Sequence, residues 1–242
     1  LMDASVGYAK GKGHIQLAYH LSMFRNANES LSWQNPFPDD QGTAGQFGRL
    51  ALEPDNDFHQ LMLTGGYQLP GNTYLTGVLS SGLMTQDQKF LPYTINDNIP
   101  VNALPRDSLD GKIRQNIVNL KLASRPNSKW NFNGSYRYHD HDNQTQQLPY
   151  TFAIADSLKT GTRAKDEIDL NVVNQPFSYT QQLAKMDCKY RFGRSSSLML
   201  GYDYENMHLK NSEVDETDEH EVWGKFKWKV GQRHVQEIIG GT

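Results

Sequence analysis

The chain has 242 residues, of which 37% are apolar and 21% are charged, as is ordinary for a folded protein. A formal net charge of −3 and the lack of any Lys/Arg-rich tract give no basic field for capturing nucleic acid, so we expect no nucleic-acid partner. The single cysteine, Cys188, excludes an internal disulfide and a cysteine-based metal cluster.

Alternation of apolar and polar side chains recurs along the chain, as expected of β-strands, whereas helical periodicity is hard to find. An early example is the apolar stripe Ile15, Leu17 and Tyr19, which alternates with Gln16 and His20. In chain order, strands are predicted at about 2–10, 14–25, 57–69, 73–86, 112–124, 129–140, 177–192, 197–210, 218–230 and, truncated, from 234.

The clearest alternation lies in the middle of the chain. One side of the strand at 129–140 carries aromatic residues and glycine, and the other side carries Asn, Ser, Arg and His. The next strands repeat the pattern with three exceptions, because Met199, Met207 and Trp223 fall on the polar side.

The connections between the strands alternate in length. Short turns rich in Gly, Pro, Asn and Ser are predicted, for example, at 11–13 and 70–72. Between them lie long polar segments at about 26–56, 87–111 and 141–176, which we expect to be outer loops. Short periplasmic turns, long outer loops and strands that are apolar on one side and polar on the other are typical of transmembrane barrels.

These features predict an all-β fold, an antiparallel transmembrane β-barrel of the bacterial outer membrane, with residues 1–242 forming part of a single barrel domain. About ten strands would be part of a larger barrel, since the chain starts within a strand and does not end on an aromatic terminal strand. The alternative is a soluble antiparallel sandwich, but its strands average nearer 5 to 6 residues and its loops have no reason to alternate in length.

Two segments could hold a metal ion, and we interpret both as solvated polar segments instead. Residues 139–142, His-Asp-His-Asp, place two histidines on one side of a strand. Residues 213–221 are rich in carboxylates but lack the spacing of a calcium-binding loop. Cys188 lies on the apolar side of its strand, which disfavours a catalytic thiol. No catalytic, cofactor-binding or metal site is therefore predicted, and we expect the chain not to be an enzyme.

The side chains expected to point into the barrel lumen are a more informative set. They carry both signs of charge and gather toward the short-turn end, where they would contact either hydrated solutes or a protein partner. The set consists of Arg137, Lys185, Asp187, Lys189, Arg191, Asp203, Glu205, Lys225, Lys227 and Lys229.

Several stretches of the chain resemble the MtrB/PioB family of decahaem-associated outer-membrane proteins. The most specific are Ala51-Leu52-Glu53-Pro54-Asp55-Asn56-Asp57-Phe58-His59-Gln60 and Ser108-Leu109-Asp110-Gly111-Lys112. Ser135-Tyr136-Arg137-Tyr138 and Leu200-Gly201-Tyr202-Asp203-Tyr204-Glu205 add to the likeness, which spans about residues 48–230.

The resemblance implies a barrel of the outer membrane that surrounds a periplasmic decahaem cytochrome in its lumen and docks an extracellular multihaem cytochrome. Such a barrel serves extracellular electron transfer, including metal reduction, and carries no cofactor of its own, because haem c is held by the partner cytochromes. Two alternatives remain open: a diffusion porin or substrate channel, and a membrane-embedded hydrolase, for which the sequence offers no recognisable nucleophile and base.

Overall fold

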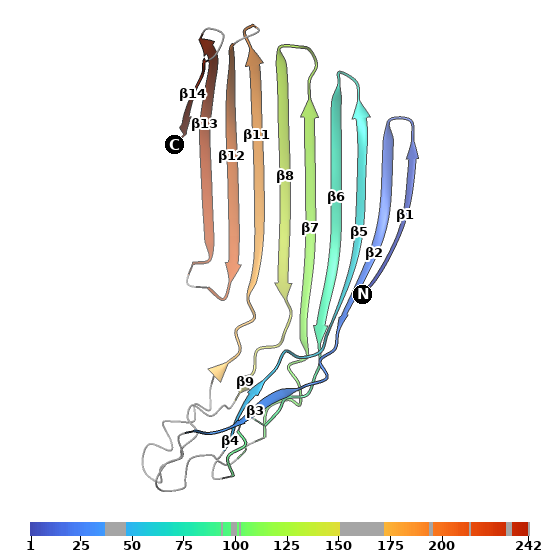
Figure 1. Cartoon of the computed structure of the whole chain (residues 1–242), viewed down its shortest axis with the longest axis vertical. Helices are drawn as coiled ribbons and strands as arrows, with labels where there is room; N and C mark the ends of the chain where they lie inside the picture. Colours follow the sequence, from blue (N-terminus) through green and yellow to red (C-terminus); the bar gives the residue numbers. More distant parts are fainter. Residues whose placement is uncertain are drawn as a thin grey trace.

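The computed structural model describes residues 1–36, 47–92, 94–97, 101, 103–150, 172–193, 196–212, 214–230 and 234–241. Ten strands form one antiparallel sheet, in the order β1-β2-β5-β6-β7-β8-β11-β12-β13-β14 (Figure 1). Their bounds are β1 Met2–Lys10, β2 Gly13–Phe24, β5 Asn56–Leu69, β6 Thr73–Gln86, β7 Gly111–Ser124, β8 Trp130–Asn143, β11 Ser178–Arg191, β12 Ser196–Lys210, β13 Glu216–Val230 and β14 His234–Gly241.

Each inner strand of this sheet pairs with the sheet strands before and after it in the chain, and β1 and β14 each pair with one strand among the described residues, so the sheet is a meander. The short turns all lie at one end of the strands and the long connections at the other (Figure 1). The first two of these turns, residues 11–12 and 70–72, contain Gly11 at φ 58° and Gly71 at φ 72°, a conformation that glycine adopts without steric cost. The eight strands from β2 to β13 in this sheet have 12 to 15 residues each. A strand of that length, tilted by about 40°, crosses an outer-membrane hydrocarbon layer.

One face of the sheet is mostly apolar, with polar residues such as Gln182, Asn206 and Asp218 toward the loop end of β11, β12 and β13, and we call it the apolar face. Paired residues point to the same side of a sheet, so the register defines cross-strand rows. One such row, across β1, β2, β5, β6 and β7, is Val6, Leu17, Leu63, Leu79 and Val118. These side chains are not packed inward, since Val6 is 69% exposed, and in β11 and β13 Met186 is 58% and Val222 62% exposed.

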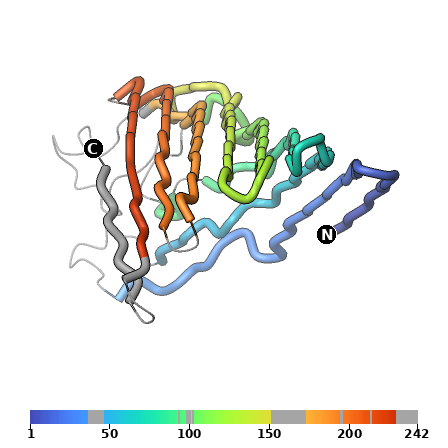
Figure 2. The backbone as a smooth tube through the Cα atoms, turned by 90° about the horizontal axis from the view of Figure 1, so that it is seen from above, coloured from blue at the N-terminus to red at the C-terminus, as the bar shows by residue number. Residues whose placement is uncertain are grey.

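The ten-stranded sheet is a single layer that curves as it passes from β1 to β13 (Figure 2). No large side chain among them is fully buried, so the apolar stripes do not pack against each other across a core. The soluble-sandwich alternative is therefore wrong for the described residues. No helix in the described ranges is long and apolar enough to span a bilayer.

Four short strands lie in the long connections, and the sequence did not predict them. β3 (Ser30–Gln34) pairs with β4 (Phe47–Ala51), and β9 (Pro149–Tyr150) pairs with β10 (Val172–Val173). The predicted strand bounds also needed small corrections. β8 runs to Asn143 rather than to residue 140, and β13 begins at Glu216, which places most of the acidic segment 213–221 in a strand instead of a loop.

Candidate functional site: the polar face of the sheet

Nine of the ten charged residues predicted to share a side of the sheet do share one, which we call the polar face. Register links Arg137 to Glu205 through Leu183, and Lys185 directly to Asp203. Asp187, Lys189 and Arg191 follow on the same side of β11, and Lys225 and Lys227 on the same side of β13. The side chain of Lys229 lies outside the described residues, and only its backbone pairing with Val235 places it.

Charge is sorted along the strands of the polar face. Nearest the short turns, two rows contain Lys189, Arg191, Lys225 and Lys227, with Ser197 and Met199 between the cations of β11 and β13 and Asn131 beside Lys189 on β8. We call these four cations the basic band. Glu237 is paired in register with Lys227, but its side chain lies outside the described ones.

Further from the turns the sign of the charge changes. Two adjacent rows hold the carboxylates of Asp203 and Glu221 and those of Glu205 and Glu219. The cations in these rows are Lys185, Arg137 and, on β7, Lys121. The polar face thus carries a basic band beside the turns and a mixed, carboxylate-rich zone deeper along the strands.

Several carboxylates of the polar face have partners on neighbouring strands. Lys185 Nζ donates to Asp203 Oδ2 at 2.7 Å, Asn133 Nδ2 donates to Asp187 Oδ1 at 2.8 Å, and Gln181 Nε2 donates to Glu205 Oε1 at 2.5 Å. These contacts join β8, β11 and β12 through their side chains. Asp203 and Asp187 therefore bind side chains of neighbouring strands within the sheet.

Trp223, which breaks the alternation in the sequence, is explained by the glycine beside it. It pairs in register with Gly201 on the polar face, and a Cβ built on Gly201 would lie 2.2 Å from Cε2 and Cζ2 of the indole ring. The ring therefore lies flat against the backbone of β12, and Trp223 Nε1 donates to Asp203 Oδ1 at 3.4 Å. The sequence places both residues on the polar sides of neighbouring strands, but only the register places the aromatic ring opposite the glycine.

The candidate metal-binding segments do not assemble a site in the described part of the chain, where no group of three or more His, Cys, Asp or Glu could hold an ion. His139 and His141 both lie beside Tyr179, with His141 stacked on its ring at a centroid distance of 5.2 Å. Glu213 lies outside the described residues. Cys188 lies on the apolar face, paired with Phe132 and Leu200, where the sequence placed it.

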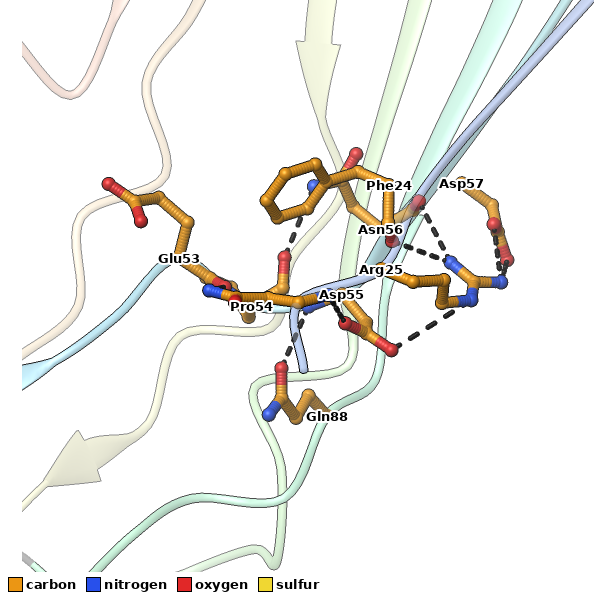
Figure 3. Close-up of polar contacts among 9 residues, drawn as sticks. Phe24, Arg25, Glu53, Pro54, Asp55, Asn56, Asp57 and Gln88 are labelled. Atoms are coloured by element: carbon orange, nitrogen blue, oxygen red, sulfur yellow. Dashed lines mark hydrogen bonds and ion pairs between the residues drawn. The ribbon is translucent and has the colours of Figure 1, made fainter. Parts of the chain in front are cut away.

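At the loop end, the first two long connections are joined by a polar cluster around Arg25 (Figure 3). Arg25 Nη2 lies 2.7 Å from Asp57 Oδ1, and its Nη1 donates to the carbonyl oxygens of Phe24 at 2.8 Å and Asn56 at 3.1 Å. Asp55 Oδ1 accepts from the backbone N–H of Asn26 at 2.7 Å.

The Asp55 N–H extends this cluster to the next connection by donating to Gln88 Oε1 at 2.7 Å (Figure 3). Similar contacts continue across the sheet. Lys112 N donates to Thr145 Oγ1 at 3.2 Å, and Asn211 Nδ2 donates to the Pro176 carbonyl at 2.8 Å. The bases of successive loops are thus tied to one another beside the strand ends.

Known proteins resemble this chain in sequence over most of its length. Residues 1–233 match the family described as outer membrane beta-barrel porin, MtrB/PioB. The outer membrane protein MtrB of Shewanella baltica (strain OS185) is 30% identical over 211 residues, which cover 87% of this chain and 28% of that protein. The chain therefore spans less than a third of the length of this relative.

A solved structure, that of the TodX monoaromatic hydrocarbon channel deltaS2 mutant, is similar over 99% of this chain and 63% of its own, with 15% identity and a TM-score of 0.34. The family match covers nearly the whole chain and agrees with the antiparallel sheet and its exposed apolar face. The chain belongs to the MtrB/PioB family and is part of an antiparallel transmembrane β-barrel of the bacterial outer membrane.

Proposed function

We propose that this chain forms part of a barrel wall that surrounds and positions a multihaem c-type cytochrome, so that electrons cross the outer membrane. The observation that carries the proposal is the polar face, where a basic band precedes a carboxylate-rich zone. In a barrel whose apolar face meets lipid, the polar face lines the lumen, with the basic band at the periplasmic mouth because the short turns are periplasmic. Such sorted charge orients a protein partner as it enters.

The chain itself would act as an insulating scaffold. With one cysteine it cannot contain the Cys-x-x-Cys-His motif for covalent haem attachment, so haem c would be carried by the periplasmic cytochrome in the lumen and by an extracellular one at the loop end. The backbone hydrogen bonds of the meander hold the wall rigid. A rigid wall keeps the partner's haems at fixed positions and away from bulk water.

The experiment removes charge from the basic band and leaves the mixed zone intact. In the full-length protein, Lys189→Gln, Arg191→Gln and Lys227→Gln are combined, and the matched control combines Lys189→Arg, Arg191→Lys and Lys227→Arg. Lys185 is left unchanged because its ion pair with Asp203 belongs to the wall. Haem-stained co-purification from outer membranes measures the retained cytochrome, and heat-modifiable migration in SDS gels measures barrel insertion.

We expect the neutral variant to lose most of its haem-containing partner while inserting normally, and the charge-conserving control to retain it. A neutral variant that retains a full haem complement contradicts the proposed role of the basic band. Absence of any haem-containing partner from the wild-type protein contradicts the cytochrome role itself.

A second candidate function is a diffusion channel. The family description names a porin, and the mixed charges of the polar face would suit a water-filled pore that selects solutes. Planar-bilayer conductance separates the two functions when it is measured on two samples, the full-length protein purified alone and the same protein with its co-purifying proteins. An open channel that persists in the co-purified complex favours the porin, and a conductance that the partner abolishes favours the sheath.

A further inference from the structure

The apolar face contains a hollow near the turn end of β1, β2, β5 and β6. Its volume is about 520 Å³, within the range of roughly 300–1,000 Å³ that small-molecule sites occupy. The floor is the paired glycines Gly65 and Gly77, with Ile15 on one side of the pair and Leu120 on the other. Because these two neighbouring positions carry no side chains, the surface between the surrounding residues is depressed by about the depth of a side chain.

Large side chains surround this floor. Tyr67 and Leu75 form the row on the turn side, and Leu63 and Leu79 form the row on the loop side. The Tyr67 ring leans toward β2, because a Cβ on Gly13 would lie 2.8 Å from its Cδ2. The side chains around the glycines therefore shape the hollow, and its mostly apolar lining suits a hydrocarbon chain.

One cation lies at the rim of the hollow. Lys10 ends β1 on the apolar face, where it pairs in register with Gly13, and it lines the hollow together with Tyr8. No Asp or Glu is among the lining residues. Since the short turns of an outer-membrane barrel face the periplasm, Lys10 lies at the depth of the phospholipid head groups of the inner leaflet.

We propose that this hollow is a binding site for an anionic glycerophospholipid, with an acyl chain over Gly65 and Gly77 and the phosphate beside the Lys10 ammonium. The apolar lining accepts any acyl chain, so charge at the rim supplies the selectivity between anionic and zwitterionic head groups. The proposal concerns the lipid side of the wall and does not depend on what occupies the lumen.

The chain offers a matched control on the same face. A second hollow, of about 460 Å³, lies around Gly134 and is lined by Leu122, Met186 and Leu200, with no Lys or Arg among its lining residues. Asp187 also lines it, but this carboxylate belongs to the polar face, where it accepts a hydrogen bond from Asn133 Nδ2. The second hollow should therefore bind hydrocarbon without selecting a head group.

The experiment uses the full-length protein exchanged into mixed micelles that contain equal mole fractions of phosphatidylglycerol and phosphatidylcholine. Native mass spectrometry then counts the lipids of each kind that remain bound to the protein as the detergent concentration is raised in steps. The variants are Lys10→Gln, Gly77→Leu and Gly134→Leu. Gly77→Leu fills the floor, where the nearest atom to a new Cβ is Cδ2 of the Leu120 side chain at 3.2 Å, and Gly134→Leu fills the control hollow, where the nearest atom is Leu122 Cβ at 4.0 Å.

The wild-type protein is expected to retain phosphatidylglycerol over phosphatidylcholine by about fivefold, the effect of one lysine near a membrane surface. Lys10→Gln should abolish the preference, Gly77→Leu should reduce retention of both lipids, and Gly134→Leu should leave the preference unchanged. Equal retention of both lipids by the wild-type protein, or a preference that survives Lys10→Gln, overturns the proposal. So does an equal loss of phosphatidylglycerol in the two leucine variants.

Discussion

Lys185 on β11 and Asp203 on β12 face each other across the polar face, with Nζ and Oδ2 2.7 Å apart. The lysine side chain is 50% exposed and the aspartate 20% exposed. Because Trp223 Nε1 also donates to Asp203, at 3.4 Å, the carboxylate is fixed by two strands at once. The charges of Lys185 and Asp203 are therefore paired within the sheet itself.

Removal of the lysine should destabilise the wall modestly. For Lys185→Met we expect the free energy of unfolding to fall by about 1 kcal/mol, since water screens this partly exposed pair but Asp203 is left with one donor. Urea unfolding in lipid vesicles, followed by tryptophan fluorescence, measures the change. In the double variant Lys185→Met/Asp203→Asn most of the loss should be recovered, and strictly additive losses would contradict a direct interaction.

The contact between Gly201 and Trp223 should tolerate no added methyl group. A Cβ at position 201 would lie 2.2 Å from the indole ring, so Gly201→Ala must displace Trp223 and should cost about 1–3 kcal/mol. The comparison is made in the background of Trp223→Ala, where the ring is absent. There the added methyl group should cost less than about 0.5 kcal/mol, and an equal cost in both backgrounds would assign the effect to the backbone of Gly201 instead.

The sequence predicted the sheet well because the alternation of apolar and polar residues that marks a strand lies within that strand. Each strand from β2 to β13 in the sheet shows the period of two within itself, and turn-forming residues such as Gly71 and Asn72 mark the reversals. The small strands of the loops carry a weak signal or none, since even β3, in which Leu31 and Trp33 alternate with polar residues, has only five residues. β3 pairs with β4 across the intervening loop residues, and β9 and β10 have two residues each, too few to show alternation.

For the polar face, the sequence predicted which charges share a side but not which ones meet. Successive side chains of a strand alternate between its two faces, and this alternation gives the side on which Lys185 and Asp203 lie. Their contact depends instead on the register between β11 and β12. Shifting that register by two residues would keep both on the same side and place Asp203 beside a different residue. Trp223 was an exception in the pattern until the register placed Gly201 opposite it.

Adjacent residues of β5 should respond oppositely to a charge. Leu61 lies on the apolar face, paired with Tyr19 and Ser81, and is 51% exposed, whereas Met62 lies on the polar face beside Ala18 and Ser80. Leu61→Arg should lower the free energy of unfolding in lipid by about 2–4 kcal/mol, since position 61 lies near the middle of the strand.

Met62→Arg is the control for this pair, and we expect it to change the free energy of unfolding by less than about 1 kcal/mol, because its guanidinium stays hydrated. Both variants are measured by urea unfolding in the same vesicles. A larger cost at position 62 than at position 61 would reverse the assignment of the faces to lipid and lumen.

Loss of the planar guanidinium of Arg25 should loosen the base of the first long loop without unfolding the sheet. In Arg25→Lys the positive charge remains, but an ammonium cannot contact Asp57 and the carbonyls of Phe24 and Asn56 in the geometry of the guanidinium. The backbone N–H of Asn26, which donates to Asp55, should then exchange roughly tenfold faster with solvent deuterium, as expected for a weakened charge-assisted hydrogen bond. Hydrogen-exchange mass spectrometry of peptides that contain Asn26 measures this.

Arg106→Lys provides the control, since it weakens the 2.7 Å pair with Asp110 in another loop and should leave these peptides unchanged. Equal acceleration in both variants would mean that the loop bases respond to a general loss of charge contacts, and no acceleration in Arg25→Lys would mean that the backbone alone holds the loop.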